Sequence, residues 1–284
     1  MKKKYHKKTA IILFFIISCN INVDKNLSDC LNTFSNLGSD QLENESNVNP
    51  VFVIGHAYGS HAGDNLGLSK NVLSFVKQQK LDNQILILTG DIVRENTIKN
   101  LQLVKNQIET NFGEYYVAVG NHDVGTEGPE NFYSVFNNDL NFISLSSIDL
   151  IVANFTTSNW KPTLKDQESI NNFIRKSSKD TIIIFSHQVF WYNLTETKPK
   201  LNETGREVSK DIHKWIQNEN KNLIIISGDY GKDDPETFCE YDTSENILYI
   251  ASGVYENVED RALVINDAIK GFSISELKLS DYSG

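Results

Sequence analysis

The chain has 284 residues, of which 39% are hydrophobic and 23% charged, and its formal net charge at pH 7 is −10. This length suits one large domain or two small ones, and the apolar content excludes disorder as the main state. The acidic balance argues against a nucleic acid partner, because binding a phosphate backbone requires a basic surface.

The first eighteen residues have the pattern of an export signal. Lysines at positions 2, 3, 4, 7 and 8 precede an apolar stretch from Ala10 to Ile17. This stretch is far shorter than the roughly 20 residues that a helix needs to cross a bilayer. We therefore predict a cleaved signal peptide over residues 1–18, whose removal changes the net charge from −10 to −15.

The apolar stretch ends in Ile16-Ile17-Ser18-Cys19, which resembles a bacterial lipobox. The resemblance implies cleavage before Cys19 and a lipid on its thiol, which would hold an exported protein at a membrane of the bacterial cell envelope. The alternative is an ordinary signal peptide in which the cysteine is incidental. Because the sequence has no second long apolar run, attachment would rest on the lipid alone.

Residues 19–50 are rich in Asn, Ser, Asp and Glu, with only scattered apolar residues. Such a composition cannot bury a core, so we expect a polar tether. Beyond Cys19 the chain has Cys30 and Cys239. An oxidising compartment would permit a disulfide between them, and two free thiols are the alternative.

From residue 51 to residue 284, short β-branched runs alternate with longer amphipathic segments, which predicts one α/β domain. Continuous apolar runs predict buried strands at Val51–Ile54, Ile85–Thr89, Tyr115–Val119, Thr181–Phe185 and Leu223–Ser227. Amphipathic segments predict helices near 66–80, 97–111, 166–177 and 207–219. Strands of hairpin or meander type are expected at Asn141–Ser146, Leu150–Phe155, Ile247–Ala251, Arg261–Ile265 and Phe272–Leu277.

Polar residues that can bind metal directly follow four of the predicted buried strands. In chain order these are Gly90-Asp91, Gly120-Asn121-His122-Asp123, Ser186-His187 and Gly228-Asp229. In an open α/β sheet the carboxyl ends of the strands form the crevice where ligands bind, so these side chains should converge.

These four motifs, with Arg94 after Asp91, resemble in order and spacing the motifs of the calcineurin-like metallophosphoesterases over roughly residues 51–253. The resemblance implies a four-layer α/β/β/α sandwich with mixed sheets. It also implies hydrolysis of phosphoric esters with two divalent metal ions, which bind phosphoryl oxygens and activate a water molecule.

One of the two metal positions keeps its ligands. By the resemblance, a divalent ion (Mn, Fe or Zn) is held by Asp91, Asn121, His187 and Asp229, the last in place of a histidine. The other position requires an Asp-x-His-x-Gly motif and a final histidine, where this chain has Gly55-His56-Ala57-Tyr58-Gly59 and Gly231. We therefore predict one bound ion rather than two, or a remodelled site.

The loop that begins at Gly55 carries further candidates. His56, His61 and Asp64 would either rebuild a ligand set or remain solvated surface groups. Glycines at positions 55, 59, 63 and 67 would let backbone N–H groups approach a phosphate, or would make the loop flexible. The loop has neither a P-loop ending nor a Gly-x-Gly-x-x-Gly fingerprint, so neither nucleotide hydrolysis nor a dinucleotide cofactor is indicated.

The resemblance also implies that His122 protonates the leaving oxygen and that Asp123 orients its imidazole. The alternative for both residues is structural hydrogen bonding. The aromatic run 190–192 (Phe-Trp-Tyr) would stack on a substrate ring or pack in the core, and Arg94 would hold a phosphate oxygen or lie exposed at a helix start.

The sequence thus favours a metal-dependent hydrolase of phosphoric esters at the cell envelope, acting on a phosphorylated substrate. The loss of three ligands from one metal position motivates an alternative. In that alternative, a catalytically degenerate phosphoesterase-like domain binds a ligand or a partner protein without turnover.

Overall fold

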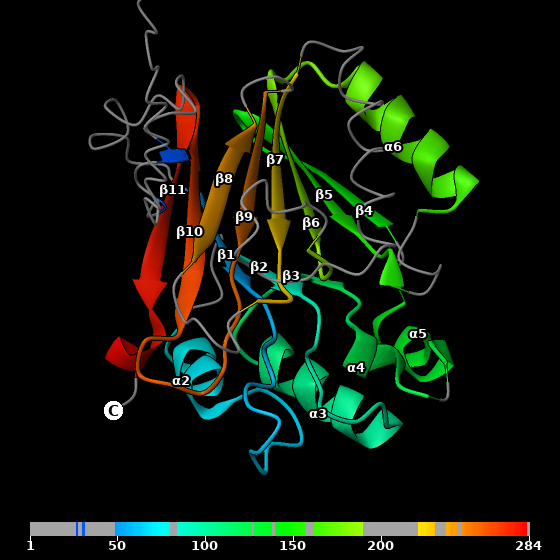
Figure 1. Cartoon of the computed structure of the whole chain (residues 1–284), viewed down its shortest axis with the longest axis vertical. Helices are drawn as coiled ribbons and strands as arrows, with labels where there is room; N and C mark the ends of the chain where they lie inside the picture. The colour runs from blue at the N-terminus through cyan, green and yellow to red at the C-terminus, as the bar shows by residue number, and fades with distance from the viewer. Residues whose placement is uncertain are drawn as a thin grey trace, which may run out of the picture.

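The computed structural model describes residues 27, 30–31, 49–79, 84–126, 128–137, 140–156, 162–189, 221–230, 237–242 and 246–282. Within these residues two mixed β-sheets pack against each other, and helices lie on the outer sides (Figure 1). No helix of the described ranges has the length and apolar character needed to span a membrane.

The first sheet has the strand order β11-β10-β1-β2-β3. Its parallel part consists of β1 (Asn49–Ile54), β2 (Ile85–Thr89) and β3 (Glu114–Ala118). On the other side of β1 the sheet continues antiparallel with β10 (Arg261–Ala268) and β11 (Gly271–Lys278).

The second sheet has the strand order β4-β5-β6-β7-β9-β8. Its parallel centre consists of β5 (Ile148–Ala153), β6 (Thr181–Ser186), β7 (Asn222–Ser227) and β9 (Ile247–Ala251). β4 (Leu140–Ser144) and β8 (Phe238–Asp242) pair antiparallel at its two edges.

Strand residues alternate between two cores, because successive side chains point to opposite faces of a sheet. Val51 and Val53 lie in the core between the sheets, whereas Phe52 and Ile54 lie in the core under the helices. This burial on both faces explains the continuous apolar runs.

The helices form the two outer layers. The first sheet is covered by α2 (Lys70–Gln78), α3 (Ile98–Glu109), α5 (Glu130–Phe136) and the 3₁₀ turn η3 (Leu279–Tyr282). The second sheet is covered by α6 (Leu164–Lys176). α6 begins at a capping box in which Thr163 accepts a hydrogen bond from the backbone N–H of Asp166. The four layers confirm the predicted α/β/β/α sandwich.

Three elements differ from the expectations. β8 was not predicted because it has no continuous apolar run, and α4 (Asn121–Val124) and α5 were not predicted because each is too short to show a helical repeat. The hairpin between β4 and β5 turns two residues earlier than expected. The buried carboxylate of Asp267 fixes this turn, because it accepts hydrogen bonds from the backbone N–H groups of Ser146 and Ser147. The helix predicted at 207–219 lies outside the described residues.

The expected tether is joined to the core. Leu27 and Cys30 are buried between the two sheets, and Cys30 forms a disulfide with Cys239 of β8 (Cα–Cα distance 6.3 Å). The expectation that residues 19–50 take no part in a core is therefore wrong at these two positions. The sequence left open whether this disulfide forms. It attaches the polar segment covalently to β8, although the composition of that segment gives it few apolar contacts of its own.

Candidate active site

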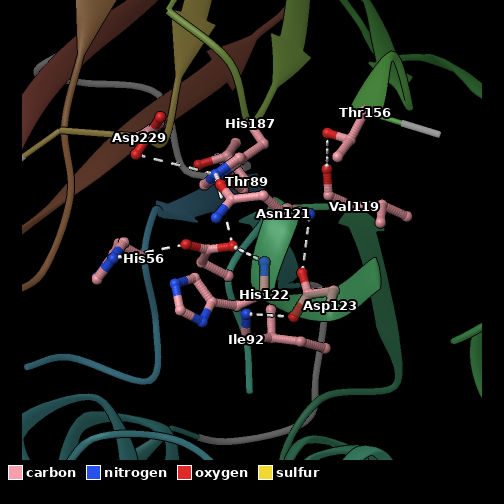
Figure 2. A network of polar contacts seen from close by, with 12 residues as sticks. His56, Thr89, Ile92, Val119, Asn121, His122, Asp123, Thr156, His187 and Asp229 are labelled. Atoms are coloured by element: carbon pink, nitrogen blue, oxygen red, sulfur yellow. Dashed lines mark hydrogen bonds and ion pairs between the residues drawn. The ribbon is translucent and has the colours of Figure 1, made fainter. Parts of the chain in front are cut away.

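The predicted polar residues meet where the parallel strands of both sheets end. Asp91 follows β2, Asn121 and His122 follow β3, His187 follows β6, and Asp229 follows β7. Figure 2 shows the labelled members of this group around His187. The structure thus brings together all four predicted metal ligands, from four strands and two sheets.

His187 lies at the centre of this group and is 1% exposed. Its Nδ1 is 3.0 Å from the carbonyl oxygen of Thr89. A carbonyl oxygen can only accept, so Nδ1 carries the proton and Nε2 is the nitrogen that faces the site. Nε2 lies 3.0 Å from Asn121 Oδ1, 3.5 Å from Asp91 Oδ1 and 3.9 Å from Asp229 Oδ1.

Gly90 makes room for this ring. Its φ is +84°, a conformation that other residues rarely adopt, and a Cβ there would lie 2.5 Å from His187 Nδ1. Steric contact therefore explains why glycine precedes Asp91, because the backbone at this position lies directly against the His187 ring.

These donor atoms fit a divalent metal ion. Ligands about 2.1 Å from one ion lie roughly 3.0 to 4.2 Å from one another, and the three separations from His187 Nε2 fall in this range. In the described part of the chain, no group of three or more His, Cys, Asp and Glu side chains has the compact spacing of a formed metal centre. The donor set here includes the amide oxygen of Asn121, which is not one of these residue types, so that three oxygen atoms face one imidazole nitrogen.

The electrostatics of His187 agree with a site that attracts positive charge. Burial by itself lowers the pKa of this imidazole, but the carboxylates of Asp91 and Asp229 outweigh burial and raise it above its ordinary value. The same negative charges would favour a bound cation.

Asp91 lies between His187 and His56 and is 1% exposed. Its φ of +52° is unusual for a residue with a side chain, and such strain concentrates at functional positions. Oδ1 accepts a hydrogen bond from the backbone N–H of His122 at 2.9 Å and faces His187. Oδ2 faces the other way, toward His56.

At the family's other metal position, one of the expected ligand sites has no room for a side chain. A Cβ on Gly55 would lie 2.3 Å from the carbonyl oxygen of Ser252 and 2.5 Å from Gly228 Cα, so no ligand side chain fits there. Ala57 is fully buried in the core under the helices. Gly231 lies outside the described residues.

His56 points into the site between these two positions. It is 7% exposed, its φ is +51°, and its Nε2 lies 3.5 Å from Asp91 Oδ2 (Figure 2). Burial is the largest influence on its pKa and lowers it below the ordinary value. Of the three loop residues considered as replacement ligands, His56 is the one that faces Asp91, whereas His61 and Asp64 are exposed.

Asp123 does not orient the His122 imidazole, contrary to the expectation. Its carboxylate is fully buried and accepts hydrogen bonds from the backbone N–H groups of Ile92, Val93 and Gly120 at 2.8–3.1 Å. Burial and the neighbouring Asp91 carboxylate raise the pKa of Asp123 to about 7. Asp123 thus links the loops after β2 and β3. This is the structural hydrogen bonding that was the alternative role for this residue.

His122 is oriented instead by the main chain. Its Nδ1 lies 3.0 Å from the carbonyl oxygen of Arg94, which leaves Nε2 as the ring nitrogen that can reach a substrate. The Arg94 side chain donates to the carbonyl oxygen of Gly63. Arg94 is exposed, as one of its two sequence interpretations expected, and in addition it links the Gly-rich loop to His122.

A group of rings, which sequence reasoning missed, surrounds His56 and His122. Tyr58 lies 4.5 Å from His56 and 5.1 Å from His122 between ring centroids, and its hydroxyl is 2.7 Å from His61 Nδ1. Tyr255 lies 6.1 Å from His56. Two sequence signals could have identified these tyrosines. Tyr58 lies inside the Gly-rich loop, and Tyr255 follows the end of a strand as the predicted ligands do. The run 190–192 lies outside the described residues.

The fold and the site together define a layered α/β protein with metal-type ligands at its strand ends. The sequence matches the calcineurin-like phosphoesterase family over residues 56–214, and the chain belongs to that family. Its members hydrolyse phosphoric esters, generally with divalent metal ions.

Two solved structures share the fold. PhoD has a TM-score of 0.53 and 10% identity, with 84% of this chain and 70% of that chain covered. A Staphylococcus aureus protein assigned as a 5′-nucleotidase has a TM-score of 0.50 and 10% identity, with 81% of this chain covered. This chain spans 54% of the length of that protein. No curated protein matches the sequence.

Proposed function

We propose that this chain is a metal-dependent hydrolase of phosphoric esters, with one tightly held divalent ion (Mn, Fe or Zn). The proposal rests on one observation, the convergence of Asp91, Asn121 and Asp229 on Nε2 of the buried His187. Three oxygen donors around an imidazole nitrogen form a site for a divalent cation.

When bound, such an ion supplies Lewis-acid stabilisation of a phosphoryl oxygen and a water of lowered pKa. The residues of this chain do the remaining work. Asp91, Asn121, His187 and Asp229 would hold the ion. The carbonyl oxygen of Arg94 holds the His122 ring so that its Nε2 can protonate a leaving oxygen. His122 is the proposed general acid, whereas Asp123 supports the loops beneath it.

We further propose that the protein acts at the bacterial cell envelope, exported by residues 1–18 and attached through a lipid on Cys19. The disulfide between Cys30 and Cys239 supports an oxidising compartment. The net charge of −10 argues against nucleic acid as substrate, so we expect a different phosphorylated molecule.

The function is tested with p-nitrophenyl phosphate and bis(p-nitrophenyl) phosphate after loading the metal-free chain with Mn²⁺, Fe²⁺ or Zn²⁺. We expect turnover with at least one ion, and a loss of at least 100-fold in both His187→Ala and Asn121→Ala, together with loss of the bound metal. Asp64→Ala, which changes an exposed carboxylate of the same loop, is the matched control and should be unaffected. Full activity in both ligand variants would exclude this site.

The binding module stays a second candidate because Gly55 and Ala57 leave no room for the family's usual ligands. In that case the metal-loaded protein would bind phosphate esters without hydrolysing them. Isothermal titration with a non-hydrolysable phosphonate, compared with the turnover assay, distinguishes the two functions.

A further inference from the structure

His61 is the most exposed ring of the group beside the site. Between ring centroids it lies 4.9 to 6.3 Å from four other rings, those of His122, His56, Tyr58 and Tyr255. The nearest is His122, the proposed general acid, at 4.9 Å. His56 and Tyr58 are buried, whereas His61 is exposed. A phosphoryl group close enough to His122 for proton transfer would therefore lie beside His61.

The backbone that carries His61 is fixed by a turn. The backbone N–H of Gly63 donates to the carbonyl oxygen of Ser60 at 3.0 Å, which closes the turn around His61. The carbonyl oxygen of Gly63 accepts a hydrogen bond from the Arg94 side chain, which comes from the loop after β2. These contacts hold the turn against the loop that carries Asp91.

The His61 side chain is held by a buried tyrosine. Tyr58 is fully buried, and its hydroxyl lies 2.7 Å from His61 Nδ1 and 3.3 Å from Nε2. Burial, together with the Asp91 carboxylate, raises the pKa of Tyr58, so the hydroxyl keeps its proton and can donate it to the nearer Nδ1. The imidazole then carries its own proton on Nε2. A side chain fixed in this way by a buried partner is typical of residues that bind ligands.

The charges of the site give an additional donor a use. The carboxylates of Asp91 and Asp229 lie 3.5 and 3.9 Å from His187 Nε2 and would balance the charge of a divalent ion there. A negatively charged phosphoryl group would then meet no net positive charge from the ion and these two carboxylates. Imidazole N–H groups bind oxyanions through charge-assisted hydrogen bonds, so His61 is suited to hold such a group.

We propose that His61 binds a phosphoryl oxygen of the substrate through its imidazole N–H, and that Tyr58 is the positioning residue that holds this ring. The proposal rests on the proposed function, because it assumes that a phosphate ester binds beside His122. It assigns no metal to His61. The hydrogen bond from His61 holds the phosphoryl group while His122 acts on the leaving oxygen.

The experiment is a calorimetric titration of the metal-loaded full-length chain with inorganic phosphate. His61→Ala should weaken phosphate binding by roughly 10- to 100-fold, the range for a lost hydrogen bond to a charged group. Its metal content by elemental analysis should not change, and it should melt within a few degrees of the wild type, because the side chain is exposed. His61→Gln keeps a side-chain N–H and should recover part of the affinity. Leu66→Ala, which changes an exposed apolar side chain of the same loop, is the control and should bind phosphate as the wild type does.

The positioning role of Tyr58 has its own variant. Tyr58→Phe keeps the buried ring and removes the hydroxyl, so it should weaken phosphate binding by roughly 2- to 10-fold. The double variant with His61→Ala should bind phosphate no more weakly than His61→Ala alone, because Tyr58 acts only through His61. Additive losses would refute this positioning role.

The proposal is overturned if the wild type binds no phosphate, or if phosphate affinity in His61→Ala stays within about twofold of the wild type. Loss of metal from His61→Ala would also overturn it, because His61 would then be a metal ligand. The proposed function is decided separately, by turnover and by His187→Ala. Phosphate binding that depends on His61 without any turnover would refute the hydrolase and leave this proposal standing, whereas turnover with His61-independent phosphate binding would do the reverse.

Discussion

The backbone atoms that crowd Gly55 predict that even a substitution by alanine will be strongly destabilising. In Gly55→Ala the new Cβ would lie 2.3 Å from the carbonyl oxygen of Ser252 and 2.5–2.6 Å from the backbone of Gly228. These atoms belong to the chain after β9 and β7, so relief requires that the ends of two buried strands move by about 1 Å. Such overpacking costs typically 1–3 kcal/mol, and the backbone contacts place this variant near 3 kcal/mol.

The assay is urea unfolding at constant pH, with the disulfide intact and with thermal melting in parallel. A loss of about 3 kcal/mol in the free energy of unfolding lowers the melting temperature by roughly 6–12 °C in a domain of this size. Gly55→Asp should lose more, because it also buries a carboxylate. Gly63→Ala is the matched control, since its Cβ would chiefly meet the movable Glu256 carboxylate at 2.7 Å. Gly55→Ala within 0.5 kcal/mol of the wild type, on the order of a surface change, would refute the reasoning.

Four further outcomes are expected. His122→Ala should lower kcat by about 10²–10⁴-fold while elemental analysis shows unchanged metal content, because its ring lies outside the donor set; loss of metal would contradict this. Asp123→Asn should lower the free energy of unfolding by roughly 2 kcal/mol in urea, since an amide cannot accept all three backbone hydrogen bonds, and wild-type stability would show that these bonds are absent. Cys239→Ala should cost roughly 2–5 kcal/mol, and the double variant with Cys30→Ala should cost no more, because one bond is lost in either case; wild-type unfolding that a reducing agent leaves unchanged would argue against the disulfide. Chelation of the metal should lower the melting temperature, since a ligand at 100 times its Kd stabilises the native state by about 2.7 kcal/mol; an unchanged melting curve would mean that the folded chain holds no ion.

The layers of the fold were predictable because both sheets are buried on both faces. Runs such as Ile85–Thr89 and Thr181–Phe185 are apolar throughout, and they were placed within one residue of β2 and β6. β8 was not predicted, since its five residues carry two acidic side chains and its place at the sheet edge comes from pairing with β9. Local pattern therefore identifies central strands better than edge strands.

The candidate site was predictable to the extent that its residues follow strands. That rule, with the family motifs, brought Asp91, Asn121, His187 and Asp229 together correctly. It failed for Asp123, because adjacency to His122 in the sequence does not decide which group a short buried carboxylate contacts. In the helix α4 its oxygens turn toward the backbone N–H groups of the loop after β2.

The sequence by itself determined the layered α/β architecture and the edge of the sheets at which polar residues gather, since both follow from local periodicity and from chain order. Only the tertiary structure decided the geometry around Asp91. His56 is aimed at Oδ2 by a carbonyl group 198 positions away at Val254, and Gly55 is closed by backbone that follows β7 and β9. Contacts between segments so distant in sequence depend on how the two sheets pack. Local sequence patterns do not specify that packing, so these contacts could not be predicted.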